Sequence, residues 1–393
     1  MLGFFKKKRI YFDYASATPE RGESARAVEK ARATFGNPGA IHAEGVEAKA
    51  VLENARERIA LQLACKAREI IFVSGGTEAN NLAILGFARK IEMKGDELMR
   101  THWVTSSIEH PSVLECFADI ERRGAVVTHV EPDSRGIIRP EALKHALRPE
   151  TVFVSIQSAN HEIGTIQPIR DISAVLKKHE EKFKGIVIFH SDMGQTPLYR
   201  SPRVHGFGVD IASFDSGKLY GPRGVGCVYL NNRTELAQVI LGGGQERGLR
   251  AGTENVALAA GFAEALECIS RERESESARI HILRDTLWSH IEKGIEGVEL
   301  NGSLKHSLPH ILNISVPNIS SEYVTLVLDN AGIAISTKSA CKEGEERRSH
   351  VVEALGGEKW RAANTLRFSL GLATTEKDVA AAARELTAAV ARH

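Results

Sequence analysis

Short apolar stretches of strand character alternate with helical patterns through the first two-thirds of this 393-residue chain, and this alternation constrains the fold more than any other feature. The apolar stretches lie at residues 10–13, 69–73, 103–106, 125–130, 151–156, 186–189 and 209–214. Helical patterns lie at residues 19–35, 44–63, 77–88, 112–122, 140–147 and 171–179. Strands and helices that alternate in this way build a parallel sheet covered by helices. The sequence therefore predicts an α/β fold with a mostly parallel sheet.

The pattern changes after Thr253, where a long helix rich in Ala, Glu and Arg is expected over residues 255–287. Strand patterns follow at residues 311–316, 333–336 and 366–370, with helical patterns at 321–330 and 375–392. Because one hydrophobic core rarely serves so long a chain, we expect two domains. The predicted division is a large α/β domain of residues 19–262 and a smaller α+β domain formed by residues 1–18 and 263–393.

Composition excludes several classes of function. Hydrophobic residues make up 42% and charged residues 26% of the chain, and the formal net charge is +1. These values are typical of a soluble globular protein without an electrostatic drive toward nucleic acid or membranes. The five cysteines are scattered and odd in number, which argues against a disulfide framework and a structural zinc site. A reducing cytoplasm is the expected setting, and a small molecule or another protein is the expected partner.

An acid and a lysine follow two neighbouring apolar stretches. Asp192 comes directly after the stretch that ends at Phe189, and Lys218 comes a few residues after the stretch at 209–214. Parallel strands present such residues at one edge of the sheet, where α/β proteins bind ligands. This pair suits pyridoxal 5′-phosphate (PLP), which needs a lysine for its aldehyde and an acid for its ring nitrogen. Taken alone, the pair also fits a turn residue and a solvated loop lysine.

Two further segments are expected at the same edge. Ser74-Gly75-Gly76-Thr77 lies between a strand and a helix, so its backbone N–H groups could hold a phosphate, although a plain helix cap is an equal alternative. His110 follows the stretch at 103–106 and could cover a flat cofactor and move protons. No set of residues has the spacing of a metal site, and we expect none.

Cys341 differs from the other cysteines because small, polar and charged residues surround it. We expect an exposed thiol on a mobile loop, and nearby Lys and Arg residues favour its thiolate form. An incidental surface cysteine is the alternative.

Ten motifs, in order along the chain, coincide with one family. They are YFDYASATP, FGNP, FVSGGTEANNLAI, IEHPSVL, NHEIGTIQP, FHSDMGQTP, SFDSGKLYGPRGVG, GGGQERGLRAGTENV, SACKEGEERRSHVVEALG and LRFSLGLATTEKDV. Over nearly its whole length the chain resembles the NifS/IscS-like cysteine desulfurases, which are fold-type I PLP enzymes of the class V aminotransferase family. The resemblance implies a mostly parallel seven-stranded sheet in a large domain and a smaller α+β domain.

The resemblance also implies a role for each matching residue. Lys218, Cys341 and His110 would be catalytic, as the cofactor-binding lysine, the sulfur-accepting nucleophile and a proton-transfer residue. The implied cofactor-binding residues are Gly75, Gly76, Thr77, His110, Asn160, Asp192, Gln195, Asp215, Lys218 and Thr253. The implied substrate-binding residues are Asn37, Asn160 and Arg367.

The implied reaction converts L-cysteine to L-alanine and leaves its sulfur as a persulfide on Cys341. A sulfur-acceptor protein, such as an iron–sulfur scaffold or a thiolation relay, would then receive the sulfur. The segment that contains Thr253 reaches the other subunit's phosphate in this family, which implies a homodimer.

The chain departs from the family pattern beside Lys218. Asp215 stands where a serine is usual and Gly217 where a histidine is usual, and an aspartate facing a phosphate would repel it. Either Asp215 turns away, toward an arginine, or PLP is held more weakly. His161 and Gln245 are further departures. They keep two alternatives open: a PLP-fold protein of low or altered activity that acts as a partner-binding subunit, and a related enzyme such as a selenocysteine lyase, an epimerase or an aminotransferase.

Overall fold

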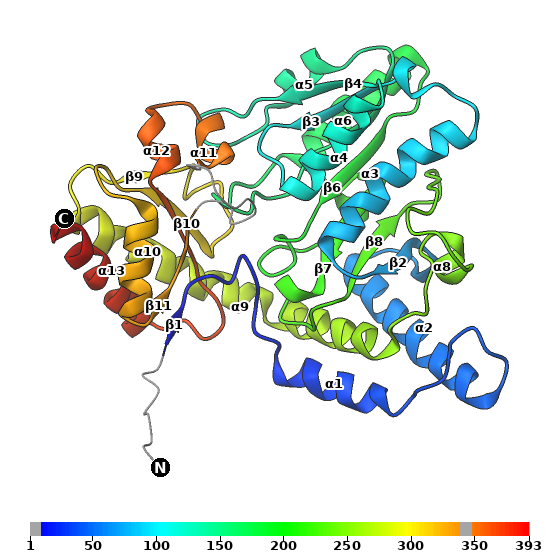
Figure 1. The fold of residues 1–393 in the computed structure, drawn as a ribbon, viewed down its shortest axis with the longest axis horizontal. Coiled ribbons are helices and arrows are strands. Elements are labelled where there is room, and N and C mark those ends of the chain that lie inside the picture. The colour runs from blue at the N-terminus through cyan, green and yellow to red at the C-terminus, as the bar shows by residue number, and fades with distance from the viewer. Residues whose placement is uncertain (1–8, 338–347, 393) are drawn as a thin grey trace.

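A computed structural model describes residues 9–337 and 348–392, and one long helix joins its two layered units (Figure 1). The larger unit contains a seven-stranded sheet in the order β2-β8-β7-β6-β5-β3-β4. Its strands are β2 (Ile70–Val73), β3 (His102–Ser106), β4 (Val126–Val130), β5 (Thr151–Ser155), β6 (Ile188–Asp192), β7 (Ile211–Asp215) and β8 (Gly226–Leu230). Strands β4, β3, β5, β6 and β7 pair in parallel, and β8 pairs antiparallel with both β7 and β2. The predicted α/β class and mostly parallel sheet are confirmed.

Helices cover both faces of this sheet. They are α1 (Gly22–Arg32), α2 (Ala43–Leu63), α3 (Gly76–Met93), α4 (Pro111–Arg122), α5 (Pro140–Ala146), α6 (Ile169–Phe183), α7 (Val204–Phe207) and α8 (Gln245–Gly248). Successive strand residues enter opposite cores: Ile188 packs in the cluster that contains residues of α3 and α4, and Phe189 packs in the cluster that contains residues of α2 and α6. Burial on both faces explains why these strands are continuously apolar rather than alternating.

The smaller unit is an antiparallel sheet with helices. Its sheet has the order β12-β13-β10-β9. The elements are β9 (Glu299–Leu300), β10 (Ile311–Ser315), α10 (Ser321–Asn330), β11 (Ile333–Ala334), β12 (Ser336–Thr337), α11 (His350–Ala354), α12 (Lys359–Ala363), β13 (Thr365–Ser369) and α13 (Glu376–Ala391). Strand β1 (Ile10–Tyr11) pairs in parallel with β11, so the described N-terminal end belongs to this unit.

Helix α9 (Val256–Gly294) connects the two units and packs against α1, α2 and α13 (Figure 1). Asn255 caps its start by accepting a hydrogen bond from the Leu258 N–H at 3.1 Å. The division between residues 262 and 263 falls inside this continuous helix, so it stays a prediction.

Some local expectations were wrong. Helix α1 begins at Gly22 rather than at Pro19, because Arg21 has an extended backbone and its N–H donates to the Tyr220 carbonyl at 2.9 Å. Strand β8 and helices α11 and α12 were not anticipated. Their segments are short and lack a periodicity of their own, so long-range pairing decides their structure.

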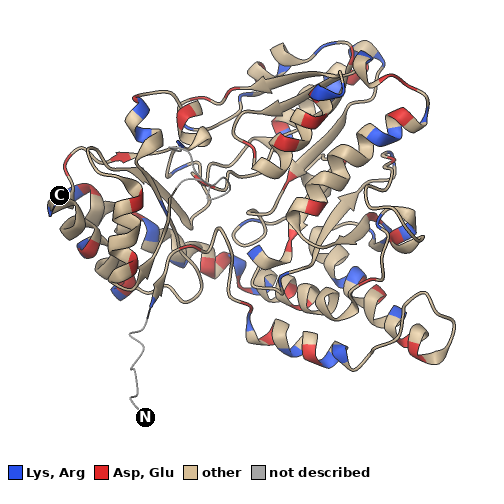
Figure 2. Ribbon diagram, in the orientation of Figure 1, with Lys and Arg blue, Asp and Glu red and all other residues tan. Residues whose placement is uncertain are grey.

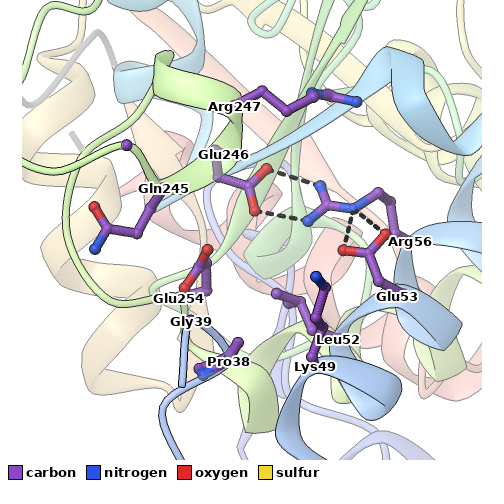
Figure 3. A pocket seen from close by; sticks show the side chains of 11 residues that line it. Pro38, Gly39, Lys49, Leu52, Glu53, Arg56, Gln245, Glu246, Arg247 and Glu254 are labelled. Atoms are coloured by element: carbon purple, nitrogen blue, oxygen red, sulfur yellow. Dashed lines mark hydrogen bonds and ion pairs between the residues drawn. The ribbon is translucent and has the colours of Figure 1, made fainter. Parts of the chain in front are cut away.

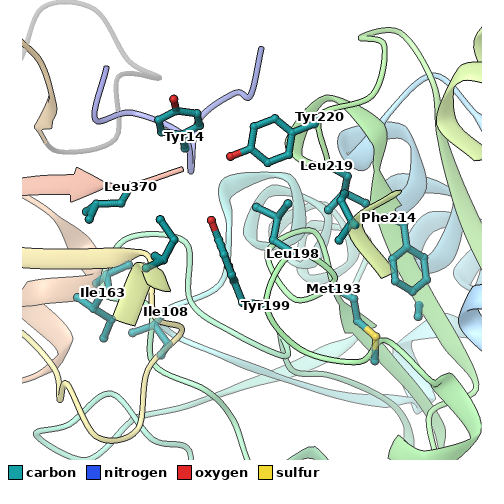
Figure 4. Close-up of a cluster of buried hydrophobic side chains, with 14 of the residues drawn as sticks. Tyr14, Ile108, Ile163, Met193, Leu198, Tyr199, Phe214, Leu219, Tyr220 and Leu370 are labelled. Carbon is teal, nitrogen blue, oxygen red and sulfur yellow. The ribbon is translucent and has the colours of Figure 1, made fainter. Parts of the chain in front are cut away.

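A cluster of buried aromatic and aliphatic side chains fills the junction between the two units (Figure 4). It brings Tyr14 and Leu370 together with Tyr220, which lies two residues after Lys218. A Cβ at Gly371 would lie 2.3 Å from the Tyr14 ring and 2.5 Å from the Tyr220 hydroxyl, so glycine is required at this close approach. The segment that carries Lys218 is therefore held by a packed core on its inner side.

Charged residues of both signs are interspersed over the helices of the two units (Figure 2). Within the described chain, no helix is both long enough and apolar enough to cross a membrane.

Candidate active site

Asp192 ends strand β6 at the carboxyl edge of the parallel strands. Its Oδ2 accepts a hydrogen bond from Asn80 Nδ2 at 2.9 Å, and its Oδ1 accepts one from the Gly194 N–H at 2.9 Å. Burial acts to raise the pKa of this carboxyl, but the Lys218 ammonium, His110 and these hydrogen bonds outweigh burial and hold the pKa below its ordinary value. Asp192 is therefore a charged acceptor at neutral pH.

Lys218 follows the neighbouring strand β7 and ends the short 3₁₀ turn Ser216–Lys218. A Cβ built at Gly194 would lie 3.2 Å from Asp192 Oδ1 and 3.9 Å from Lys218 Nζ. The acid and the amine thus converge on the same backbone position. The structure brings together the two residues that the sequence pattern paired.

Thr18 holds the turn that carries Lys218 from both sides. Its hydroxyl donates to the Gly217 carbonyl at 3.0 Å and accepts from the Tyr220 N–H at 2.7 Å. The sequence analysis did not predict this contact. Its only indication in the sequence is that Thr18 lies in a loop rich in small residues. The clamp limits where the lysine Cα can lie.

A hydrogen-bond chain links Asp192 to His110. Asn80 of α3 donates one Nδ2 hydrogen to Asp192 and the other to Ser112 Oγ at 2.9 Å. Ser112 lies 2.8 Å from His110 Nδ1 through its hydroxyl and donates its backbone N–H to the same nitrogen at 3.1 Å. Because Nδ1 accepts that N–H, the neutral His110 ring carries its proton on Nε2.

His110 is the N-cap of α4, with Pro111 at the first helical position. Burial, and then the nearby Lys218 ammonium, lower its pKa to about 4. His110 is therefore neutral at physiological pH and able to accept a proton only with help from a nearby anion. Sequence reasoning predicted His110, but it missed Asn80 and Ser112, which fix its tautomer.

Two more imidazoles lie near His110. The His161 ring packs edge-on against it, with 5.1 Å between the ring centroids, and neither ring nitrogen of His161 has a hydrogen-bond partner among the described residues. His350, at the start of α11, lies 3.1 Å through Nε2 from the Glu109 carbonyl. His350 was not predicted as a site residue, because no local sequence pattern indicates that it lies near His110.

Asn160 and Gln195 are buried beside these groups and partly engaged. Asn160 Oδ1 accepts the N–H groups of Glu162 and Ile163 at 2.8 and 2.9 Å, and its Nδ2 donates to the Ile108 carbonyl at 3.0 Å. Gln195 Nε2 donates to the Ala15 carbonyl at 2.8 Å. Each amide keeps one Nδ2 or Nε2 hydrogen that no hydrogen bond in the described chain uses.

Arg367 lies on β13 and faces the segment that precedes α1. Its guanidinium donates to the His161 carbonyl at 2.8 Å and pairs with Asp13 at 2.7 Å. The Nε atom is buried and has no partner in the described part of the chain. A third hydrogen bond goes to Ser16 Oγ, so Arg367 keeps its Nε–H and one Nη1 hydrogen as donors but shares its charge with Asp13.

Asp215 does not turn toward an arginine: no ion pair joins it to one among residues 9–337 and 348–392. Its Oδ2 accepts the Gly76 N–H at 3.1 Å, and its Oδ1 accepts the Gly217 N–H at 2.8 Å. The carboxylate thus lies at the N-terminus of α3, over the glycines that were expected to hold a phosphate. The Thr77 side chain at this helix start is exposed.

Asn37 and Thr253, two other predicted site residues, are near a separate pocket. The FGNP segment that contains Asn37 contributes Pro38 and Gly39 to a pocket lined also by Gln245 and Glu254, the residue after Thr253 (Figure 3). Asn37 and Thr253 are both exposed. The chain does not bring Asn37 together with Arg367, so their joint role stays a prediction. Cys341 lies outside the described residues.

A buried ion pair forms the wall of this pocket (Figure 3). Arg56 Nη1 and Nη2 each donate to Glu246 at 2.7 Å, and Glu246 also accepts the Phe72 N–H at 2.8 Å. Glu246 adopts a left-handed backbone conformation, with φ of 46°. The pair fixes the segment after β8 to strand β2.

Replacing Glu246 with alanine should lower the free energy of unfolding by about 3–5 kcal/mol, because it leaves Arg56 charged and buried without its partner. Urea denaturation followed by circular dichroism measures the change. Glu235→Ala is the matched control: its carboxylate pairs with Lys94 at the surface and should barely shift the midpoint. Equal midpoints for the two variants would contradict a structural role for the buried pair.

Comparisons with known proteins agree with this geometry. The family model for class V aminotransferases matches residues 10–381. The chain belongs to the class V aminotransferase family, as the parallel sheet and the paired acid and lysine at its edge indicate.

Several of its relatives within the family are named cysteine desulfurases. The cysteine desulfurase IscS of Dictyoglomus turgidum is 40% identical over 374 residues, which cover 95% of this chain and 92% of the relative. The putative cysteine desulfurase IscS 1 of Bacillus subtilis is 36% identical over 387 residues, which cover 98% of this chain and 99% of the relative. A solved NifS-like protein is 32% identical, with a TM-score of 0.89 over 98% of this chain and 100% of the other. The resemblance stated from the motifs is confirmed.

Proposed function

We propose that this chain is a PLP-dependent cysteine desulfurase that converts L-cysteine to L-alanine and keeps the sulfur as a persulfide on Cys341. The convergence of Asp192 and Lys218 on Gly194 carries the proposal, because PLP needs an amine for its aldehyde and an acid for its ring nitrogen. A solved relative, SspA in complex with cysteine, is 33% identical with a TM-score of 0.79.

The residues present fit the ring end of PLP. Lys218 would hold the aldehyde carbon, Asp192 the ring nitrogen, and the remaining amide hydrogens of Asn160 and Gln195 would suit the ring oxygen. The flat His110 side chain, held by Ser112, would lie against the ring. When bound, PLP supplies an electron sink for carbanion chemistry at the substrate. The phosphate end fits less well, because Asp215 accepts the hydrogen bond of the Gly76 amide.

The chain's own groups supply charge and proton transfer. Asp192 stays ionised and hydrogen-bonded, so it can keep a ring nitrogen protonated next to it. Lys218 Nζ would carry protons to and from the substrate, and the neutral His110 ring would donate a hydrogen bond through its Nε2–H. Arg367 would bind the substrate carboxylate through its guanidinium, which would share its charge between the substrate and Asp13.

Cys341 would act as the nucleophile. Its thiolate attacks the sulfur of L-cysteine, an S–S bond forms, and the C–S bond breaks with its electron pair returning to carbon. Protonation of that carbon completes alanine, so no outside oxidant is needed. The four described cysteines are free, which suits a reducing compartment such as the cytoplasm.

A homodimer and a sulfur-acceptor protein complete the proposal. Asn37 and Thr253 are exposed and precede Pro38 and Glu254, which line the pocket of Figure 3, and a second copy could use them in its own site. The acceptor would be an iron–sulfur scaffold or a thiolation relay.

Mass spectrometry after incubation with L-cysteine tests this function. The Cys341 peptide should gain the mass of one sulfur atom while one alanine forms per persulfide, and Cys341→Ser should lose both signals. Cys116→Ser is a matched control, because that thiol is buried and burial raises its pKa to about 12. Alanine release by Cys341→Ser at the parent rate would remove the nucleophile assignment.

One observation favours a second candidate. The Asp215 carboxylate over the Gly76 amide would suit a weakly active protein that serves a partner as a binding subunit. The same experiment separates the two: a partner-binding subunit forms neither alanine nor persulfide from L-cysteine.

A further inference from the structure

We propose that Asp215 makes this cofactor site accept pyridoxal-type aldehydes that lack the 5′-phosphate at least as well as PLP. The inference rests on the proposed function, because it concerns the ligand that Lys218 would hold. It goes further by naming the chemical form of that ligand.

Asp215 is held in place by two backbone groups. One oxygen accepts the N–H of Gly76 in the first turn of α3, and the other accepts the N–H of Gly217, the residue before Lys218. A Cβ at Gly76 would lie 3.2 Å from Asp215 Oδ2, so the carboxylate lies close against the backbone of the helix start. Rotating the side chain away would break both hydrogen bonds.

The Asp215 carboxylate therefore already occupies the anion-binding position at the N-terminus of α3. Gly75, the N-cap, has no side chain to offer, and a carboxylate from β7 takes the position that a phosphate would use. The preceding loop is similar: the Ser74 N–H donates to Glu78, and Glu78 pairs with Arg250. Two carboxylates against one arginine leave an excess of negative charge at this end of the helix.

A phosphate dianion would meet an unfavourable site. It would have to share the Gly76 amide with a like charge or displace Asp215 and break its two hydrogen bonds. A 5′-hydroxyl is neutral and can donate a hydrogen bond to the carboxylate instead. The ring end of the site, formed by Asp192, His110 and Lys218, is the same for both ligands.

Titration of the protein with three aldehydes tests the proposal. PLP, pyridoxal and 5′-deoxypyridoxal are compared through the visible absorption of the adduct with Lys218, followed by borohydride reduction and peptide mapping. The deoxy compound is needed because pyridoxal closes to an internal hemiacetal in water. Lys218→Ala gives the background from other lysines.

In the parent protein, 5′-deoxypyridoxal should bind with a dissociation constant no larger than that of PLP. In Asp215→Ser, PLP should bind about tenfold tighter or more, because the carboxylate no longer competes for the amide, while 5′-deoxypyridoxal should change little. Asp215→Asn distinguishes the effect of the carboxylate charge from the effect of its volume. PLP should bind this variant with an affinity between those of the parent and Asp215→Ser, since the amide removes the charge but still fills the position.

A parent protein that binds PLP more tightly than 5′-deoxypyridoxal would overturn the inference and leave the proposed function intact. An unchanged ratio of the two dissociation constants in Asp215→Ser would do the same. A failure of every aldehyde to reach Lys218, in the parent and in both variants, would instead remove the proposed function together with the inference.

Discussion

Lys218→Ala is expected to abolish the visible absorption that the parent protein develops with PLP and to lower alanine formation from L-cysteine by about 10³-fold or more. The reason is that Lys218 is the amine that converges with Asp192 on Gly194, so its loss removes both the covalent link and a proton carrier. Absorption spectroscopy and an alanine assay with excess PLP measure the two effects.

Lys94→Ala is the matched control for this experiment. Lys94 pairs with Glu235 at the surface and should leave both signals unchanged. If Lys218→Ala kept the parent spectrum while Lys94→Ala lost it, the assignment of the cofactor lysine would be wrong.

Asp192→Asn should lower the rate constant kcat by about 10²–10³-fold while PLP stays attached to Lys218. Asparagine has nearly the same shape and can still accept from the Gly194 N–H, but it carries no charge to keep a ring nitrogen protonated. Steady-state kinetics with a parallel absorption spectrum separate loss of chemistry from loss of binding.

Asn80→Ala gives a graded comparison for this prediction. It removes one hydrogen bond to Asp192 and the link through Ser112 to His110 but leaves the Asp192 charge, so we expect a loss of about tenfold. A parent-like kcat in Asp192→Asn would mean that the ring nitrogen needs no anion here.

Much of the fold and the centre of the site could be predicted from local sequence. Asp192 and Lys218 each follow an apolar run that is buried on both faces of the sheet, and such runs have a strong local signature. Strand β8 has a similar composition but follows a turn, and its pairing with β2 is antiparallel and distant in sequence. No local pattern reports such a pairing.

The supporting contacts of the site could not be predicted for the same reason. Asn80 lies on a helix, and only the packing of α3 beside β6 brings it to Asp192. Thr18 contacts the Lys218 turn from the loop before the predicted helix, and no local pattern indicates that contact. The conflict between Asp215 and a phosphate was visible in the sequence, but its resolution on the Gly76 and Gly217 amides required the structure.

The central claim is that one amine and one acid at the sheet edge hold a single aldehyde ring. Borohydride reduction of the PLP-treated protein, followed by peptide mapping, tests it most directly. We expect one modified lysine per chain, located at Lys218. In Asp192→Asn the same lysine should be modified, although the rate constant kcat for alanine formation falls. Modification spread over surface lysines, with the Lys218 peptide unmodified, would contradict it.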